Sequence, residues 1–342
     1  MNTATAHILD TYIAPAAPRL GFIGTGWIGR MRMEALLKEH IADCCTVYDP
    51  SPTAATEAAA LQHGIRVSKS LTDILAQDDL DGVVIATPSA LHADHCIAAL
   101  EASKAVFCQK PLARTCEETQ RVVDTARTAN RLLGVDFSYR YLAGVETLKH
   151  KIFTGELGEI YAADLVFHNA DGPDKPWFYD VSSAGGGCVM DLGIHLVDLA
   201  NYLLGNRVIR QVSSNLFHKG KAILPPYEVV EDYATAEFMH GRTRTRLACS
   251  WNLHAGRDAV IEASFYGTHG GASITNVNGS FYDFEVHQFS GTSREKLAGY
   301  PDAWGGRALI DWVKNLSHSN TFDPDVEQAI QVADVIDRIY CR

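Results

Sequence analysis

Short apolar runs alternate with helical patterns along the first 137 residues of the chain. The runs lack the strict alternation of half-buried strands and read RLGFIGTG, CCTVYDP, DGVVIATP, KAVFCQKP and LLGVDF. The segments between them have helical character and are residues 27–40, SPTAATEAAALQHG, SALHADHCIAALEAS and TCEETQRVVDTARTAN. Apolar strands joined by helices indicate a parallel sheet that is covered on both faces. The pattern predicts a doubly wound α/β domain over residues 19–137.

Local signals mark the ends of two of these helices. Ser51 can cap the second helix, Pro52 suits its first turn and Gly64 suits its exit. Thr115 and Glu118 have the spacing of a capping box before the fourth helix.

The pattern changes after residue 140. We expect a helix over about 144–154, a turn and strand in GELGEIYAADLVFH, an apolar helix over 188–204, and helices over about 304–316 and 324–340. Residues 208–290 show strand-like alternation broken by turns, and DYATAEF and RTRLACSW are predicted neighbours in an antiparallel pair. The pattern predicts a second, α+β domain over 138–342, built on a largely antiparallel sheet.

Composition narrows the function classes. The chain has 342 residues and a formal net charge of −11, which argues against a nucleic-acid partner because phosphate binding needs a basic surface. It has no run of 18 apolar residues, so we expect no membrane partner. The eight cysteines include no CxxC pair, and we expect reduced thiols, a cytoplasmic location and no metal site. Residues 1–18 lack the features of a secretory signal and are expected to form a flexible arm or a partner-binding arm.

The stretch GFIGTGWIGRM predicts a dinucleotide site. It carries Gly24, Gly26 and Gly29 in the G-x-G-x-x-G pattern, follows a predicted strand and opens a helix. Gly24 permits the tight turn, Gly26 lets the backbone approach a pyrophosphate, and Gly29 lets the helix pack on the strand. The first helical residues, Trp27 and Ile28, lie where free N–H groups and the helix dipole attract phosphates.

Asp49 indicates which dinucleotide binds. It follows the second predicted strand, where a carboxylate would accept hydrogen bonds from the ribose hydroxyls of adenosine. A 2′-phosphate would meet like charge there, and no arginine adjoins Asp49 in the sequence. We predict NAD as the cofactor, with NADP less favoured, although a turn-forming role before Pro50 is compatible with both.

Two neighbouring strand ends, in IATPSALH and CQKP, should face the cofactor, because ligands of such sheets bind beyond the carboxyl ends of the strands. For His92 in the first segment, a helix-capping or surface position is as plausible as a contact with the cofactor. The candidate cofactor neighbours at these ends are Thr87, Pro88, His92, Gln109 and Lys110.

A second constellation lies in GGGCVMDLGIHLVDLANYLLG. Asp191 and His195 are four residues apart in an otherwise apolar predicted helix, so they should share a face. Hydride transfer from a carbinol needs a base for the hydroxyl proton, while a neighbouring carboxylate orients this base and a cation near the oxygen would stabilise the developing alkoxide. His195, Asp191 and Lys110 provide these functions, whereas Asp191 and His195 satisfying each other within the core is the alternative. Asp198 is a weaker candidate, with a structural role favoured for it.

These motifs together resemble the Gfo/Idh/MocA oxidoreductase family, which includes glucose–fructose oxidoreductase and inositol dehydrogenases. The resemblance rests on GFIGTGWIG, ATPSALH, QKP, GELGEI and GGGCVMDLGIHLVD and covers nearly the whole chain from Arg19. It implies an N-terminal Rossmann domain, a C-terminal domain with a large open sheet, and a homodimer or homotetramer. It also implies that Lys110 is the family's catalytic-site lysine, commonly before a cis proline, and that His195 of the D-x-x-x-H pair is the acid/base.

Two segments depart from the family pattern. Where the family usually reads Glu-Lys-Pro, this chain has Gln109, which keeps hydrogen-bonding capacity for a ribose hydroxyl but loses a charge. The family's Asn-x-Arg-Phe segment reads SYRY here, so that Arg140 matches, as a candidate substrate residue, and the asparagine does not.

The segment DGPDKPWFYDVSSAGGG, just before Asp191, is the predicted substrate loop. Trp177 and Tyr179 could stack on a sugar face and Asp180 could bind hydroxyls, or the aromatic rings could only anchor the loop. Asn252 and His254 are weaker substrate candidates.

The sequence therefore favours an NAD-dependent dehydrogenase that oxidises a secondary or anomeric hydroxyl of a sugar, polyol or sugar derivative. In this interpretation His195 is the acid/base and Lys110 stabilises the alkoxide. The alternatives are a glycosidase of the same fold that uses tightly held NAD in a transient oxidation, and a non-catalytic regulator that senses NAD. The presence of Lys110 and His195 argues against the regulator, which needs neither residue.

Overall fold

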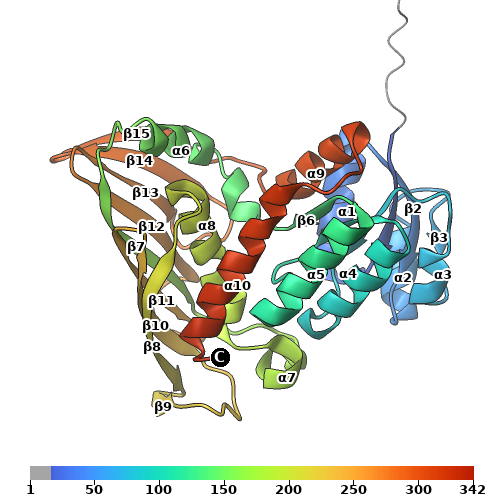
Figure 1. The fold of residues 1–342 in the computed structure, drawn as a ribbon, viewed down its shortest axis with the longest axis horizontal. Coiled ribbons are helices and arrows are strands. Elements are labelled where there is room, and N and C mark those ends of the chain that lie inside the picture. Colours follow the sequence, from blue (N-terminus) through green and yellow to red (C-terminus); the bar gives the residue numbers. More distant parts are fainter. Residues whose placement is uncertain (1–16) are drawn as a thin grey trace, which may run out of the picture.

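The computed structural model describes residues 17–342, which form two sheets separated by layers of helices (Figure 1). Helix α10 (Gln328–Ile339) lies between the sheets, against α5 (Cys116–Ala129) on one side and α8 (Ile194–Leu204) on the other. The predicted fold class, a doubly wound parallel sheet plus a largely antiparallel α+β domain, is confirmed. The predicted arm, residues 1–18, lies outside the described residues except for its last two.

The N-terminal sheet is parallel throughout and has the order β3-β2-β1-β4-β5-β6. Its strands are β1 (Arg19–Ile23), β2 (Asp43–Tyr48), β3 (Arg66–Val67), β4 (Gly82–Ile85), β5 (Ala105–Cys108) and β6 (Leu133–Val135). Its other helices are α1 (Trp27–Glu39), α2 (Pro52–Ala59), α3 (Leu71–Leu75), η1 (Ser89–Leu91) and α4 (His92–Glu101). Helices α1 and α2 pack on one face and α3, α4 and α5 on the other, which explains why the strands are apolar without alternation.

The second sheet has the order β15-β14-β13-β12-β7-β11-β10-β8-β9 and is antiparallel except where β7 meets β11. Its strands are β7 (Ile160–Asn169), β8 (Ile209–His218), β9 (Lys221–Ile223), β10 (Tyr233–His240), β11 (Thr243–Ser250), β12 (Ala259–Gly267), β13 (Gly271–Asn276), β14 (Phe284–Ser290) and β15 (Ser293–Gly299). The helical segments of this part are η2 (Ser138–Tyr141), α6 (Val145–Phe153), η3 (Pro176–Tyr179), α7 (Val181–Ala184), the π-helical turn η4 (Val189–Gly193), α8, α9 (Arg307–His318), η5 (Pro324–Glu327) and α10. The predicted antiparallel pair is confirmed as β10 and β11.

Two helix starts follow the predicted cap residues. The Ser51 side chain accepts the N–H of Ala54, and the Thr115 side chain accepts the N–H of Glu118. The reciprocal half of the capping box does not form, because the Glu118 carboxylate accepts the backbone N–H of Arg114 instead.

Helix α9 returns to the N-terminal domain, which the division at residue 137 did not predict. Its Trp312 packs against Gly82 and Gly134, where added Cβ atoms would lie 2.9 Å and 2.5 Å from the indole. The indole also lies beside Phe107, with 5.7 Å between the ring centroids. The helix therefore belongs to the core that contains α1 and α2. The boundary at residue 137 divides the two sheets, but the core of the N-terminal domain includes a helix from beyond this boundary.

One helical run, Val181–Leu204, has the length and hydropathy of a membrane-spanning helix. Within the protein, 83% of this window is buried, and α8 lies between the second sheet and α10. Burial in the core therefore accounts for its apolar character.

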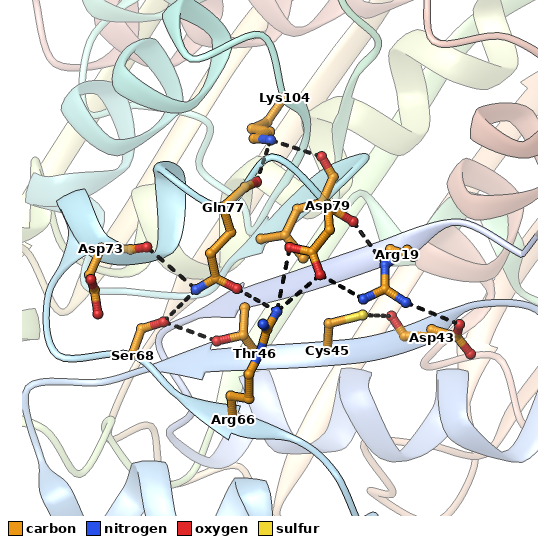
Figure 2. Close-up of polar contacts among 11 residues, drawn as sticks. Arg19, Asp43, Cys45, Thr46, Arg66, Ser68, Asp73, Gln77, Asp79 and Lys104 are labelled. Carbon is orange, nitrogen blue, oxygen red and sulfur yellow. Dashed lines mark hydrogen bonds and ion pairs between the residues drawn. The ribbon is translucent and has the colours of Figure 1, made fainter.

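A polar network closes the amino-terminal edge of the parallel sheet (Figure 2). Arg19 donates to the carbonyl oxygen of Asp79 at 2.9 Å and to its carboxylate at 2.7 Å. The Lys104 side chain is buried, and its ammonium donates to the carbonyl oxygens of Gln77 at 2.7 Å and Leu80 at 3.0 Å. Arg19 and Lys104 therefore stabilise the turn that joins α3 to β4.

We expect Lys104→Met to lower the free energy of unfolding by about 1–3 kcal/mol, because it leaves buried carbonyl oxygens without a donor. Denaturant unfolding followed by circular dichroism measures the change. The matched control is Lys38→Met at the exposed end of α1, which should have little effect. Equal stability of the two variants would contradict the role assigned to Lys104.

Candidate active site

The glycine motif forms a turn in which two of the three glycines leave no room for a side chain. Gly24 has a φ of 86°, and a Cβ atom there would lie 2.6 Å from the backbone of Ala86. A Cβ atom on Gly29 would lie 2.2 Å from the carbonyl oxygen of Gly24. Gly26 has nothing within 4 Å of its Cβ position, so a pyrophosphate has access to the backbone there.

The first turn of α1 fits a bound diphosphate. Gly26 is its N-cap without a side-chain cap, and the turn contains no acidic residue. The first N–H groups of the helix are therefore free of competing side chains and carry the positive end of the helix dipole. Trp27 is exposed and Ile28 is partly exposed at this end.

Asp49 ties the end of β2 to the glycine turn. Its carboxylate accepts the N–H of Thr25 at 2.7 Å and the N–H of Ser51 at 2.8 Å. A carboxylate has about four acceptor sites, and Asp49 is partly exposed, so capacity is left for the ribose hydroxyls of a dinucleotide.

The end of β4 places two of the three predicted cofactor neighbours at the surface. Thr87 and Pro88 are partly exposed. The His92 ring is buried, with Nδ1 2.6 Å from the carbonyl oxygen of Pro111 and Nε2 2.7 Å from that of Thr87. Contrary to the prediction, His92 has no ring nitrogen left for a cofactor, because both nitrogens face the loops that follow β4 and β5.

The two domains meet in an ion pair. Lys110 follows β5 and is joined to Pro111 by a cis peptide bond. Its Nζ lies 2.8 Å from Oδ1 of Asp191 and 2.7 Å from the backbone oxygen of the same residue. The Trp251 indole donates to Oδ2 of Asp191 at 3.2 Å. Both charged side chains are less than a fifth exposed, so the pair is partly removed from water.

The turn that carries Asp191 is π-helical, not α-helical. A spacing of four residues is close to one turn in an α-helix and in a π-helix alike, so the turn type does not by itself decide what each side chain binds. No hydrogen bond joins the two side chains within residues 17–342, and the Asp191 carboxylate binds Lys110 and Trp251 instead. The predicted orientation of the imidazole by Asp191 is therefore wrong, and so is the alternative in which the two residues satisfy each other.

The glycines before this turn accommodate protein groups. A Cβ atom on Gly186 would lie 2.1 Å from the Tyr340 hydroxyl, and one on Gly187 would lie 1.9 Å from the carbonyl oxygen of Glu231. The buried Glu231 carboxylate accepts the N–H groups of Gly187 at 3.0 Å and Val189 at 2.9 Å, and the Tyr340 hydroxyl at 2.7 Å. These bonds fix the start of η4 and thereby the position of Asp191.

His195 begins the second turn of this helical segment, and its Nδ1 is buried without a hydrogen-bond partner among residues 17–342. The ring lies 4.8 Å from that of Tyr139 and 6.3 Å from that of Phe167, measured between centroids. Burial lowers the pKa of the imidazole well below its ordinary value, and the positive charges of Lys110 and Arg32 act in the same direction.

Gln109 was expected to contact a ribose hydroxyl. Its side chain is buried, and its amide donates to the carboxylate of Asp136, which also accepts from Nε of Arg32 at 2.5 Å. The amide N–H therefore serves a buried carboxylate, whereas the amide oxygen has no partner among residues 17–342, and the predicted ribose contact stays a prediction.

Arg140 does not join the ion pair. Its guanidinium binds the carboxylate of buried Asp198 through two hydrogen bonds, with 2.9 Å from Nε to Oδ2. It lines a cavity of about 650 Å³ with Tyr202 and Trp312, and none of Lys110, Asp191 and His195 lines this cavity. Arg140 is thus bound by buried Asp198, away from Lys110, Asp191 and His195, and its predicted contact with a substrate stays a prediction.

The predicted substrate loop lies beside Asp191. The Tyr179 ring packs edge-on against Trp251, 5.6 Å between centroids, and Trp177 stacks on Phe178 at 3.8 Å. Asp180 instead caps α7, where its carboxylate accepts the N–H of Ser182 at 3.1 Å and the hydroxyl groups of two serines. It is therefore engaged within the loop and exposed, and its predicted contact with substrate hydroxyls stays a prediction. The weaker candidates Asn252 and His254 are exposed.

Two family models match the chain. The model described as an oxidoreductase family with an NAD-binding Rossmann fold matches residues 18–137, and the model of the GFO/IDH/MocA C-terminal domain matches residues 145–273. The chain belongs to the Gfo/Idh/MocA family. The resemblance inferred from the motifs is confirmed, and the N-terminal domain of this family member is an NAD-binding Rossmann domain.

Curated relatives in the family include sugar dehydrogenases. D-glucoside 3-dehydrogenase of Escherichia coli (strain K12) is 31% identical over 206 residues, which cover 57% of this chain and 58% of that protein. Levoglucosan dehydrogenase of Pseudarthrobacter phenanthrenivorans is 38% identical over 165 residues, which cover 46% and 42%. The chain spans about half the length of the curated relatives it matches.

A solved structure of levoglucosan dehydrogenase in complex with NADH is also similar. It is 25% identical, has a TM-score of 0.78, and the match covers 94% of this chain and 96% of that chain. The likeness therefore extends over both domains of the family member.

Sequence reasoning missed three residues that surround the ion pair and His195. Tyr139 packs on the imidazole, Trp251 donates to Asp191, and Asp136 binds Gln109. Tyr139 and Asp136 follow β6, whose carboxyl end lies at the same edge of the sheet as Lys110. Their position after this strand could have identified them as site residues from the sequence. Nothing in the strand pattern of β11 marks Trp251.

We expect Tyr340→Phe to lower the free energy of unfolding by about 1–3 kcal/mol, because it removes a buried hydroxyl that serves both Glu231 and the N–H of Met190. Tyr227→Phe is the matched control, since its ring packs on Tyr340 and no hydrogen bond to its hydroxyl occurs within residues 17–342. Thermal and denaturant unfolding measure both. A Tyr340→Phe variant as stable as the control would contradict the role of the hydroxyl.

Proposed function

We propose that the protein is an NAD-dependent dehydrogenase that oxidises a secondary or anomeric hydroxyl of a sugar, polyol or sugar derivative. The observation that carries the proposal is the ion pair of Lys110 and Asp191 beside His195, whose Nε2 is not buried and has no hydrogen-bond partner among residues 17–342. The lysine comes from the carboxyl edge of the NAD-binding sheet, and the other two residues come from the second domain.

His195 is the base in this proposal. Burial and the charge of Lys110 lower the pKa of the imidazole, so the ring is neutral near pH 7 and can accept the hydroxyl proton. The same effects make the protonated ring unfavourable, so the ring does not retain the proton strongly after the transfer.

Lys110 stabilises negative charge on the reacting oxygen. Its ammonium has three N–H donors, and two of them bind Asp191. The third is available to the substrate oxygen, where charge develops as the proton leaves. Asp191 holds the ammonium in place, and Trp251 holds Asp191.

When bound on the glycine turn, NAD would supply the hydride acceptor. Gly26, the first turn of α1 and Asp49 would hold its diphosphate and ribose, as their geometry allows.

Two observations support a carbohydrate or polyol as the substrate. The exposed ring of Tyr179, which suits the apolar face of a sugar, packs on the buried Trp251 beside Asp191. The relatives named above are dehydrogenases of a glucoside and of levoglucosan. We further propose a cytoplasmic homodimer or homotetramer, in which the outer face of the second sheet forms contacts.

Lys110→Ala and His195→Ala should each lower kcat by about 10²–10⁴-fold, because each removes a group that acts on the reacting oxygen or its proton. The assay is NADH formation with a panel of polyols and aldoses. NADH binding, measured by fluorescence, should change little.

Exposed Lys38→Ala is the control and should retain full turnover. Normal turnover in either active-site variant would refute the assignment. Cleavage of aryl glycosides without net NADH formation would instead identify the glycosidase.

The pH profile tests the state of His195. In the oxidation direction, kcat/KM should stay constant from about pH 8 down through 6.5, the ordinary pKa of histidine, and fall only below it, because the lowered pKa keeps the base neutral. Lys110→Met should raise the pKa of His195, since it removes a nearby positive charge. Ring resonances in an NMR titration report this pKa directly, and a wild-type pKa above 6.5 would contradict the proposal.

A further inference from the structure

Asp136 is a buried carboxylate that the proposed mechanism does not use. It follows β6 and is 1% exposed. It accepts hydrogen bonds from Nε of Arg32 at 2.5 Å, from the Gln109 amide and from the Ser138 hydroxyl. Arg32 is also buried and donates to the Ser138 hydroxyl at 3.0 Å.

The three donors belong to three parts of the candidate active site. Arg32 lies in α1, the helix that opens at the glycine motif. Gln109 directly precedes Lys110. Ser138 directly precedes Tyr139, whose ring lies 4.8 Å from that of His195. A single carboxylate thus connects the dinucleotide-binding helix to the surroundings of both proposed catalytic residues.

We propose that Asp136 is a positioning residue that couples the dinucleotide-binding helix to Lys110 and His195. This inference deepens the dehydrogenase function proposed above and rests on it. The carboxylate fixes the residue before the lysine and the residue before the tyrosine that packs on the imidazole.

The charges of this cluster explain why an amide stands at position 109. The cluster contains one buried cation and one buried anion, and either alone would be costly. Gln109 adds an N–H donor without adding charge. A carboxylate at position 109 would repel Asp136, unless position 136 became neutral and supplied the donor.

The same charges act on His195. Lys110 and Arg32 lower the pKa of the imidazole, Asp136 is the anion paired with Arg32, and Asp191 lies on the preceding turn. Removal of the negative charge at position 136 should therefore lower the pKa of His195 further. A second negative charge at position 109 should raise it.

The test uses Asp136→Asn, Gln109→Glu and the double variant Gln109→Glu/Asp136→Asn. Each single variant should lower kcat by about tenfold, because a hydrogen bond to a charged group is lost. The double variant keeps one carboxylate and one amide in contact, and it should recover most of the wild-type kcat and melting temperature. Asp124→Asn, on the exposed side of α5, is the control for charge removal at the surface.

The pKa of His195, followed by ring NMR, separates positioning from a merely structural role. We expect it to fall in Asp136→Asn, to rise in Gln109→Glu and to return toward the wild-type value in the double variant. Shifts of the same sign in both single variants, or losses that add in the double variant, would overturn the proposal. If the single variants do not fold, the double variant still tests the proposal, because it should fold and turn over like the wild type. A double variant that does not fold or does not turn over would also overturn the proposal.

The NMR readout requires no turnover. A wild-type protein that forms no NADH with any sugar or polyol would refute the dehydrogenase function. The shifts of the His195 pKa would still decide whether Asp136 acts on this residue.

Discussion

The ion pair between Lys110 and Asp191 is the contact on which the proposed chemistry depends. It joins the carboxyl edge of the parallel sheet to the π-helical turn of the second domain, 81 residues further along the chain. Because both side chains are partly removed from water, the attraction is stronger than that of an exposed pair, and a lost partner would leave a desolvated charge. The pair therefore holds the lysine and the second domain in one relative position.

Each end of this pair is supported by a buried carboxylate that accepts several donors. Asp136 holds the residue before Lys110, and Glu231 holds the start of the turn that carries Asp191. A buried carboxylate is stable only when its acceptor sites are filled, and here backbone N–H groups, hydroxyls, an amide and a guanidinium fill them. The positions of the proposed catalytic groups are thus set by fully bonded side chains behind them.

The parts of the fold that depend on local pattern were predictable from the sequence. The parallel strands, the β10–β11 pair and the caps of α2 and α5 follow from periodicity and from residues near the helix ends. The return of α9 was not predictable, because the Trp312 contacts with Gly82 and Gly134 lie far apart in the sequence. The same reason applies to the partners of Arg140 and Gln109. The motifs identified Lys110, Asp191 and His195 as neighbours, but the pairing of Asp191 with Lys110 and Trp251 depends on contacts between distant segments.

His195 differs from the carboxylates around it. The carboxylates of Asp136, Asp191 and Glu231 are all bonded, whereas Nδ1 of His195 has no partner among residues 17–342. An unpartnered buried group costs about 1–3 kcal/mol, and a polar neighbour could have removed this cost. A purely structural histidine would be expected to have acquired such a partner, as His92 has done between two carbonyl oxygens. Nε2, the other ring nitrogen, is not buried and has no hydrogen-bond partner among residues 17–342, so it can accept a proton from a substrate, which supports a catalytic role for His195.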